Sequence, residues 1–231
     1  MLFFDPTYLI FVFLPTLVLS GLAQLFVSSA YRKWGNTQNG SGLTGVQVAE
    51  RILSRTNLRG VSLEGTPGRL SDHYDPRTHT VRMSEDIATR PSVAAMAVTA
   101  HELGHAQQHQ EHSPLIALRN FLVPAVQFSP TIGYMLILFG LLFAITELAW
   151  AGVLLFGLMV VFMLLTLPVE IDASVRGMRL LRESGLLTVE TDESGSRQIL
   201  TAAALTYFAA AITAVLQLLY FISLVQGSSR D

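Results

Sequence analysis

The 231-residue sequence contains no cysteine. This absence excludes disulfides and thiolate metal sites, so His, Asp and Glu remain as the side chains that can bind zinc. Charge is scarce as well: Asp, Glu, Lys and Arg make up 14% of the residues, against roughly 25% in a typical soluble domain. The formal net charge is −2, so the chain also lacks the basic surplus that binding to nucleic acid requires. We therefore expect no nucleic-acid partner.

Long apolar runs account for the scarcity of charge. Hydrophobic residues make up 51% of the chain, and four runs approach the roughly 20 residues that cross a bilayer core as a helix. These runs are residues 8–27, 128–145, 150–167 and 199–225. Only residues 146–149 separate the second run from the third, which predicts a tight transmembrane hairpin. The sequence thus predicts an integral multi-pass membrane protein surrounded by a lipid bilayer.

Positively charged residues predict how the chain is oriented. None occurs in residues 1–7, which contain Asp5, so we expect the first run to be a retained anchor rather than a cleaved secretory signal. The turn between the second and third runs has none either. Basic residues follow the first run and lie between the third and fourth, at Arg32, Lys33, Arg176, Arg179, Arg182 and Arg197. By the positive-inside rule, the regions after the first and third runs are predicted to lie in the cytoplasm.

The sequence between the first two runs contains the motif H-E-x-x-H. An α-helix advances 3.6 residues per turn, so His101 and His105 would point their imidazoles from one helix face toward one metal ion. Two imidazoles and a third protein ligand hold a catalytic zinc and leave one position for water. Glu102 would take the proton of that water as general base. The same pentapeptide also occurs by chance on ordinary polar helices, so its surroundings must decide between the two interpretations.

Glu170 is the predicted third ligand. It directly follows the third apolar run, and the hairpin returns it to the side of the membrane that holds His101. A carboxylate so close to a membrane span is costly unless protein or a metal is its partner. Asp172 and Ser174 are predicted to lie beside the site and to orient a histidine. For Asp172, an ion pair with Arg176 four residues on is an equally weighted alternative.

The remaining histidines are predicted to lie outside the metal site. The longer signature H-E-x-x-H-x-x-G-x-x-H fails, because Gln108 and Glu111 occupy its glycine and last histidine positions. A histidine one further turn along the helix from His105 could not reach the same ion together with the first two. The histidines expected at the surface are His73, His79, His109 and His112.

Five segments follow from these patterns. The first transmembrane helix with its interfacial flank is predicted at 1–34, a soluble catalytic segment at 35–114, a linker and the transmembrane hairpin at 115–167, the third-ligand segment and a loop at 168–198, and the last transmembrane helix with its tail at 199–231. The fold class expected is a mainly α membrane protein with about four transmembrane helices and a small α+β zincin-like catalytic domain between the first and second.

Within the soluble segment the sequence predicts two helices and a strand. One helix is expected at 44–58, and a second, capped by Ser92, carries the motif to about Gln110. The strand is expected at 78–84. It could offer an unpaired edge to which an extended peptide substrate adds, or it could be purely structural.

Four stretches resemble the YugP-like family of predicted neutral zinc membrane metallopeptidases, itself similar to the glutamate-ligated zincins, or gluzincins. The stretches are 43–45, 72–77, 100–106 with 108–109, and 167–174, and together they extend from residue 43 to residue 174. The resemblance implies peptide-bond hydrolysis, one zinc ion per chain and a multi-pass membrane location.

Carried over by position, the resemblance implies His101, His105 and Glu170 as metal ligands and Glu102 as the general base. Ser174 departs from the broader group, which often has an acidic residue at this position. No residue is assigned to stabilise the transition state; the candidates are Arg176, Arg179 and His73.

The leading functional hypothesis is a zinc metallopeptidase that hydrolyses peptide bonds in membrane or membrane-proximal proteins. We expect it in a prokaryotic plasma membrane, with its catalytic site at the cytoplasmic face. The alternative is a catalytically silent membrane scaffold that is stabilised by zinc or binds a partner; Glu102 argues against it, because a structural site needs no general base. A metal-dependent hydrolase of a non-peptide amide or of a lipid is a third hypothesis.

Overall fold

The computed structural model describes residues 5–228, and its chain forms two compact units. One unit comprises Met1–Ala23, Leu118–Pro168 and Thr206–Asp231, and the other comprises Gln24–Ala117 and Val169–Leu205. The outer ends of the predicted first and last segments, residues 1–4 and 229–231, lie outside the described residues. Helices α2, α6, α7 and α8 each contribute to both units.

The first unit is built from the apolar parts of long helices. Within residues 5–228, four helical stretches are long and apolar enough to cross a membrane, which agrees with the predicted number of spans. The first stretch joins α1 (Pro6–Tyr8), η2 (Leu9–Phe13) and α2 (Leu14–Gly35). The other three are α6 (Pro114–Leu142), α7 (Thr146–Glu183) and α8 (Glu190–Ser228).

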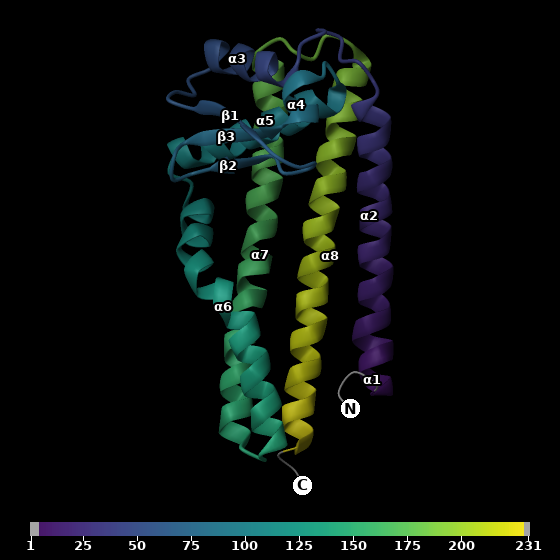
Figure 1. Cartoon of the computed structure of the whole chain (residues 1–231), viewed down its shortest axis with the longest axis vertical. Coiled ribbons are helices and arrows are strands. Elements are labelled where there is room, and N and C mark those ends of the chain that lie inside the picture. Colours follow the sequence, from purple (N-terminus) through teal and green to yellow (C-terminus); the bar gives the residue numbers. More distant parts are fainter. Residues whose placement is uncertain (1–4, 229–231) are drawn as a thin grey trace. The chain divides into compact units, whose positions relative to one another are not determined.

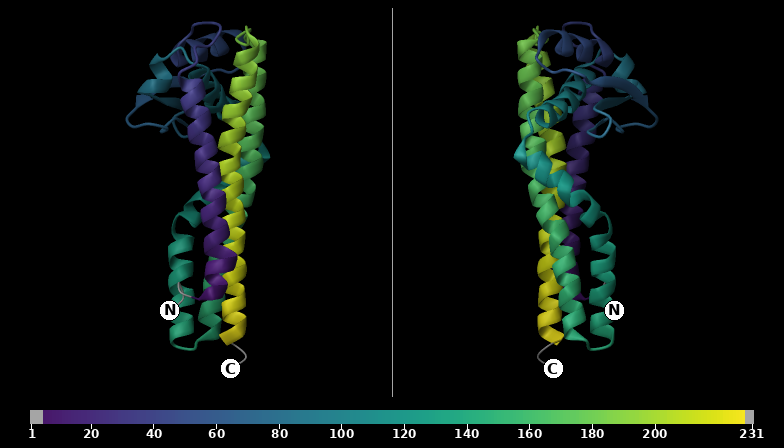
Figure 2. Two further views of the ribbon diagram at one scale, coloured as in Figure 1. Left: turned by 90° about the vertical axis from the view of Figure 1, so that its right-hand side faces the viewer. Right: turned by 90° about the vertical axis from the view of Figure 1, so that its left-hand side faces the viewer.

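Two of these helices run further than the sequence predicted. A linker was expected before the second span, but α6 is one helix from Pro114 onward and contains Pro124 and Pro130. The third span was expected to end at 167, whereas α7 continues through Pro168 to Glu183, as its unbroken ribbon in Figure 2 shows. A proline removes one helical hydrogen bond, and packing along a long apolar helix can offset that loss. The residues after Pro168 therefore keep helical spacing.

The second unit contains α3 (Gly45–Arg55) and α5 (Val93–Gln110), whose starts follow from their capping residues. Thr44 and Gln47 form a capping box at the start of α3. Ser92 caps α5 as predicted, because its hydroxyl accepts a hydrogen bond from the N–H of Ala95. The shorter helix α4 (Glu85–Thr89) precedes α5. Fully buried side chains of this unit include Ile52, Met83, Met96, Leu103, Leu180 and Leu181.

A three-stranded sheet lies beside α5 in the second unit (Figure 1). Its order is β1 (Ser62–Thr66), β3 (Thr80–Ser84), β2 (His73–Asp75), with β1 parallel and β2 antiparallel to β3. The strand predicted at 78–84 is thus β3, and it is the central strand. Both of its edges are hydrogen-bonded, so it offers no free edge to a substrate. Of the two interpretations given to this strand, the purely structural one therefore applies. The sheet edges belong to β1 and β2.

Candidate metal centre

His101, His105 and Glu170 come together in the second unit. The two histidines lie on α5 and the carboxylate lies on α7. Glu170 Oε2 is 3.3 Å from Nε2 of His101 and 3.4 Å from Nε2 of His105. The ligand atoms of all three residues lie within 4.8 Å of one another, and the glutamate is buried. The structure therefore brings the three sequence-predicted ligands to one place.

The spacing of these atoms fits a zinc ion. Zn–N and Zn–O bonds are about 2.0 to 2.1 Å long, so two corners of a tetrahedral site are about 3.3 Å apart. Both nitrogen-to-oxygen separations match that value. Two imidazoles and one carboxylate are also the donor set of zinc sites that keep a fourth position open. His101 and His105 would bind zinc through Nε2, and Glu170 would bind it through a carboxylate oxygen.

Glycines let α5 and α7 approach closely enough to form this site. A Cβ atom at Gly104 on α5 would overlap the backbone carbonyl oxygen of Ala173 on α7. A Cβ atom at Gly177 on α7 would lie 2.8 Å from the carbonyl oxygen of Ala100 on α5. Both separations are shorter than normal contacts with a Cβ atom. The absence of side chains at these two positions therefore sets the distance between the helix that carries the histidines and the helix that carries the glutamate.

Ser174, predicted to lie beside the site, contacts His101. Its hydroxyl oxygen is 3.2 Å from Nδ1 of His101, the ring nitrogen that does not face Glu170. Because α7 continues through Pro168, Ser174 lies one turn after Glu170 on the same helix face. The imidazole of His101 is thus held at both nitrogens by α7.

Gln108 contacts His105, and the sequence analysis did not predict this contact. Its side-chain oxygen is 2.9 Å from Nδ1 of His105, while its amide nitrogen donates to the Val169 carbonyl at 2.9 Å and to Asp172 at 2.7 Å. Both acceptors require the NH₂ group, so the amide orientation is fixed and His105 Nδ1 must carry the hydrogen. The Nε2 lone pair is then directed to the metal site. A glutamine three residues after a histidine on one helix is a signal that could have found this pair.

Asp172 forms the ion pair with Arg176 that was one of its two interpretations, and it reaches a histidine only through Gln108. Its Oδ2 accepts a hydrogen bond from Gln108, and the same oxygen forms a 2.7 Å ion pair with Nε of Arg176. The guanidinium of Arg176 also pairs with Glu111 through Nη1 at 2.5 Å. A chain of polar contacts therefore runs from His105 through the fully buried Gln108 to charged groups of α7 and of the C-terminal end of α5.

Glu102 is buried next to the site without a partner of its own. Within residues 5–228 its carboxylate makes no hydrogen bond or ion pair, and 8% of the residue is exposed. Burial alone would lower the pKa of His105, but the hydrogen bond with Glu170 and the negative charges of Glu102 and Glu170 outweigh burial and raise that pKa. The carboxylates of Glu102 and Glu170 thus favour a positive charge beside His105, as expected of a cation site.

His109 was predicted to be exposed, but it is half-buried in the structure. Nδ1 of His109 and Nδ1 of His79 lie 2.6 Å and 2.5 Å from the hydroxyl of Tyr74 on β2, and both histidines are half-buried. Burial, followed by the charge of Asp75, raises the pKa of Tyr74 to about 12. Burial and the neighbouring His79 and His112 lower the pKa of His109. This cluster fastens β2 to the last turn of α5.

The three candidates for a transition-state group have different surroundings. Arg176 is held by Asp172 and Glu111, Arg179 lines a cavity between α7 and α8, and His73 is exposed on β2 with Nδ1 2.8 Å from the carbonyl oxygen of Ser71. None of them forms a hydrogen bond or ion pair with the three ligand candidates in the described part of the chain.

Comparisons with known proteins identify the family. A family model described as "Putative neutral zinc metallopeptidase" matches residues 9–226. The protein named "Putative membrane protease YugP" of Bacillus subtilis (strain 168) is 39% identical over 213 residues, which cover 92% of this chain and 94% of that protein. No solved structure matches the chain. Because the family match extends over nearly the whole chain, the protein belongs to the family described as "Putative neutral zinc metallopeptidase".

Proposed function

We propose that the protein is a zinc-dependent membrane metallopeptidase that hydrolyses peptide bonds in membrane or membrane-proximal proteins. The observation that carries this proposal is the meeting of His101, His105 and Glu170 at the spacing of tetrahedral zinc ligands, with Glu102 next to His101 on α5. The names of the family and of the Bacillus subtilis relative indicate the same class of protein. Four apolar helices support a membrane location.

Each residue of the site has a distinct role in this proposal. A zinc ion held by the three ligands would supply Lewis-acid chemistry, polarising the scissile carbonyl and lowering the pKa of a water molecule. Glu102 accepts the proton of the attacking water and passes it to the leaving amine as the C–N bond breaks. Ser174 and Gln108 are positioning residues, because each fixes one imidazole ring in the orientation that directs Nε2 to the metal.

Replacing the general base separates a peptidase from a silent zinc scaffold. We expect Glu102→Gln to retain zinc, because Glu102 is not a ligand, and to lose about 10²–10⁴-fold in the rate of cleavage of casein or of a membrane-protein substrate. Metal analysis and a cleavage assay on the same preparation measure the two properties. Glu50→Gln, at an exposed glutamate on α3, is the matched control and should cleave at the wild-type rate. Undiminished cleavage by Glu102→Gln would falsify the role given to this residue.

We further propose that the metal site faces the cytoplasm of a prokaryotic cell. The support is the position of the basic residues, which follow the first apolar stretch and lie between the last two, while the turn before α7 has none. Reporter fusions after Ala149 and after Arg182 test the orientation. We expect activity of a cytoplasmic reporter only after Arg182; the opposite pattern would place the site on the other side.

A further inference from the structure

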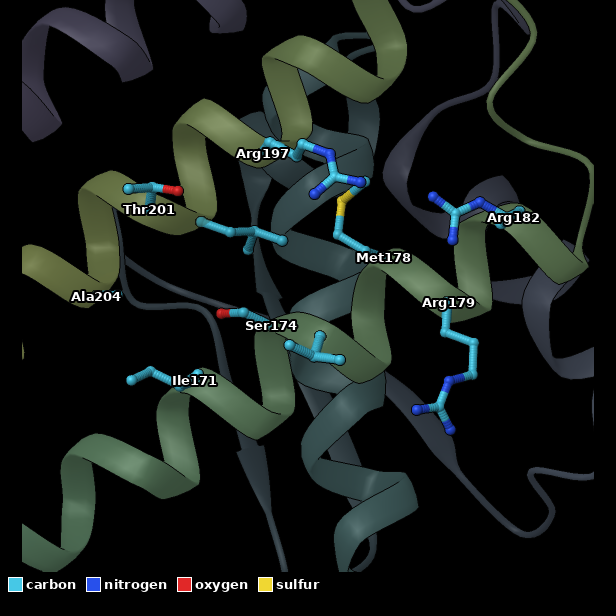
Figure 3. Close-up of a pocket in the computed structure, with 10 residues that line it drawn as sticks. Ile171, Ser174, Met178, Arg179, Arg182, Arg197, Thr201 and Ala204 are labelled. Atoms are coloured by element: carbon cyan, nitrogen blue, oxygen red, sulfur yellow. The ribbon is translucent and has the colours of Figure 1, made fainter.

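A cavity of about 450 Å³ lies between α7 and α8 in the second unit, next to the metal centre (Figure 3). Its lining comes from residues 171–182 of α7 and residues 197–204 of α8. Ser174, whose hydroxyl contacts His101, is part of this lining. The three ligand candidates and Glu102 are not among the lining residues. The proposed peptidase chemistry therefore does not use this cavity.

Three arginines give one end of this cavity a positive charge. Arg182 and Arg197 both pair with the single carboxylate of Glu193, at 3.0 Å and 2.7 Å. Arg179 forms no ion pair in residues 5–228, and the neighbouring carboxylate of Asp172 is already bonded to Arg176. Figure 3 shows Arg182 and Arg197 at one end of the cavity and Ile171 and Ala204 at the other, with the Arg179 side chain directed away from Arg197. An occupant with at least one negative group is therefore favoured at the arginine end.

The opposite end of the cavity continues an exposed apolar surface along α7. Ile171 and Val175 are exposed, and their separation of four residues places them on one face of the helix. The next positions of that face are Arg179 and Arg182.

The same order of residues occurs on α8. Leu205 is an exposed apolar residue, and Thr201 and Arg197 follow on the same face toward the N-terminus. Both helices thus change from exposed apolar to cationic in the same direction. A bilayer has the same sequence of environments, from acyl chains to anionic headgroups, and basic pockets between transmembrane helices are a known form of lipid site.

We propose that this α7–α8 cavity binds an anionic phospholipid, with the phosphate at the end lined by the three arginines and the first part of an acyl chain against Ile171 and Val175. An acidic peptide would satisfy the arginines, but it would leave the exposed apolar surface below them without a partner. Since Ser174 lines the cavity and contacts His101, the bound lipid lies against the residue that orients a predicted zinc ligand. The proposal concerns binding and does not depend on peptidase activity.

Competition between two lipids tests this proposal directly. Full-length protein in detergent is given equal amounts of dioctanoyl phosphatidylglycerol and dioctanoyl phosphatidylcholine, and the bound lipids are counted by native mass spectrometry. We expect several times more phosphatidylglycerol than phosphatidylcholine on the wild type. Each arginine near an anionic membrane contributes roughly fivefold in affinity, so Arg179→Gln/Arg197→Gln should weaken phosphatidylglycerol binding at least tenfold. Equal binding of the two lipids to the wild type, or unchanged binding to the variant, overturns the proposal.

A charge-matched control separates the cavity from the general charge of the protein. Arg51→Gln/Arg55→Gln removes two arginines from α3, where both are exposed. It should bind phosphatidylglycerol like the wild type; an equal loss would mean diffuse electrostatic attraction and would contradict a defined site. Thr201→Phe keeps every arginine but fills the cavity from an exposed position on α8. It should also lose the lipid, which keeps the test valid if the arginine variant folds poorly.

Two competitors distinguish the possible sources of the negative group. Inorganic phosphate at millimolar concentration should displace little phosphatidylglycerol, because it cannot use the apolar wall. An acidic casein peptide should not displace the lipid at micromolar concentration. Displacement by phosphate would make the cavity a simple anion site, and displacement by the peptide would make it a substrate subsite; either result overturns the lipid proposal.

Discussion

The two histidines of the metal centre are held by different kinds of partner. His101 faces the hydroxyl of Ser174, which can rotate, whereas His105 faces the carbonyl oxygen of Gln108, an amide fixed by two further acceptors. A fixed partner restricts the ring more strongly than a rotating hydroxyl does. The site should therefore depend more on Gln108 than on Ser174.

A comparison of Gln108→Leu with Ser174→Ala tests this asymmetry. Leucine fills a similar volume but leaves Nδ1 of His105, the Val169 carbonyl and Asp172 without their buried partner. We expect Gln108→Leu to weaken zinc binding about 10–100-fold, and Ser174→Ala to weaken it less. Competition with a chromogenic chelator gives both affinities. Equal affinities of Gln108→Leu and the wild type would remove Gln108 from the site.

Some residues of the site could be predicted from the sequence and others could not. Glu170, Asp172 and Ser174 were predictable because they follow an apolar run whose hairpin returns them to the side of the H-E-x-x-H helix. Gln108 was noted as a position where glycine was missing from a longer signature and as part of a stretch that resembles the family, but not as a partner of His105. Its partners lie on α7, some 60 residues away in sequence, and one sequence contains no record of that contact.

Among the elements, the packing of α5 on α7 determines whether the three ligands can meet. Gly104→Ala would push these helices apart, because its Cβ overlaps the Ala173 carbonyl oxygen. Such overpacking typically costs about 1–3 kcal/mol, and here it also moves both histidines away from Glu170. We expect a lower thermal stability and weaker zinc binding. Gly157→Ala on α7, where a Cβ atom would meet nothing within 4 Å, is the control and should leave zinc affinity unchanged.

The contact between β2 and β3 predicts a pH dependence. Hydrogen bonds from the Arg82 side chain and the Arg77 N–H lower the pKa of Asp75 to about 2, from an unfolded value of 3.8. A lowered folded pKa adds stability that is complete above the unfolded value and disappears as the pH falls toward the folded value. We therefore expect Asp75→Asn to be less stable than wild type at pH 7, with the difference vanishing between about pH 4 and 2.

Thermal melts followed by near-UV circular dichroism over this pH range measure the effect of Asp75. Arg82→Gln removes the partner of Asp75 and should show the same loss at neutral pH. Adding Asp75→Asn to Arg82→Gln should then cause little further change. A full additional loss in the double variant would show that Arg82 is not the source of the effect.

The elements differ in how well the sequence predicted them. The helix after Ser92 was predictable because a good N-cap precedes a long run of helix formers, and four spans were evident from apolar length. β1 and β2 were not, because β1 is mostly exposed and contains Gly65, and β2 has only three residues. Their pairing with β3 is a tertiary property, so the central position of that strand could not be read from its own residues.

At the scale of the whole molecule, a zinc ion would join two helices that are distant in sequence. His101 and His105 precede the transmembrane hairpin and Glu170 follows it, so the metal would close a long loop of the chain. A ligand that binds only the folded state stabilises it, by about 4 kcal/mol at 1,000 times its dissociation constant. Zinc should therefore contribute to the stability of the entire protein as well as to its chemistry.

The dependence of melting temperature on zinc tests this coupling. For a chain of this length we expect saturating zinc to raise the melting temperature of the metal-free wild type by about 10 °C. Glu170→Gln should show a clearly smaller rise because a charged ligand is lost, whereas Glu102→Gln should show the full rise. Asp192→Asn is the control: Asp192 is fully buried and accepts hydrogen bonds from the N–H groups of Gly40, Thr188 and Val189, far from the ligands in sequence. It should melt at a lower temperature but gain as much from zinc as the wild type. If Glu170→Gln gained as much as the wild type, the metal would be bound without α7, and the three-ligand site would be wrong.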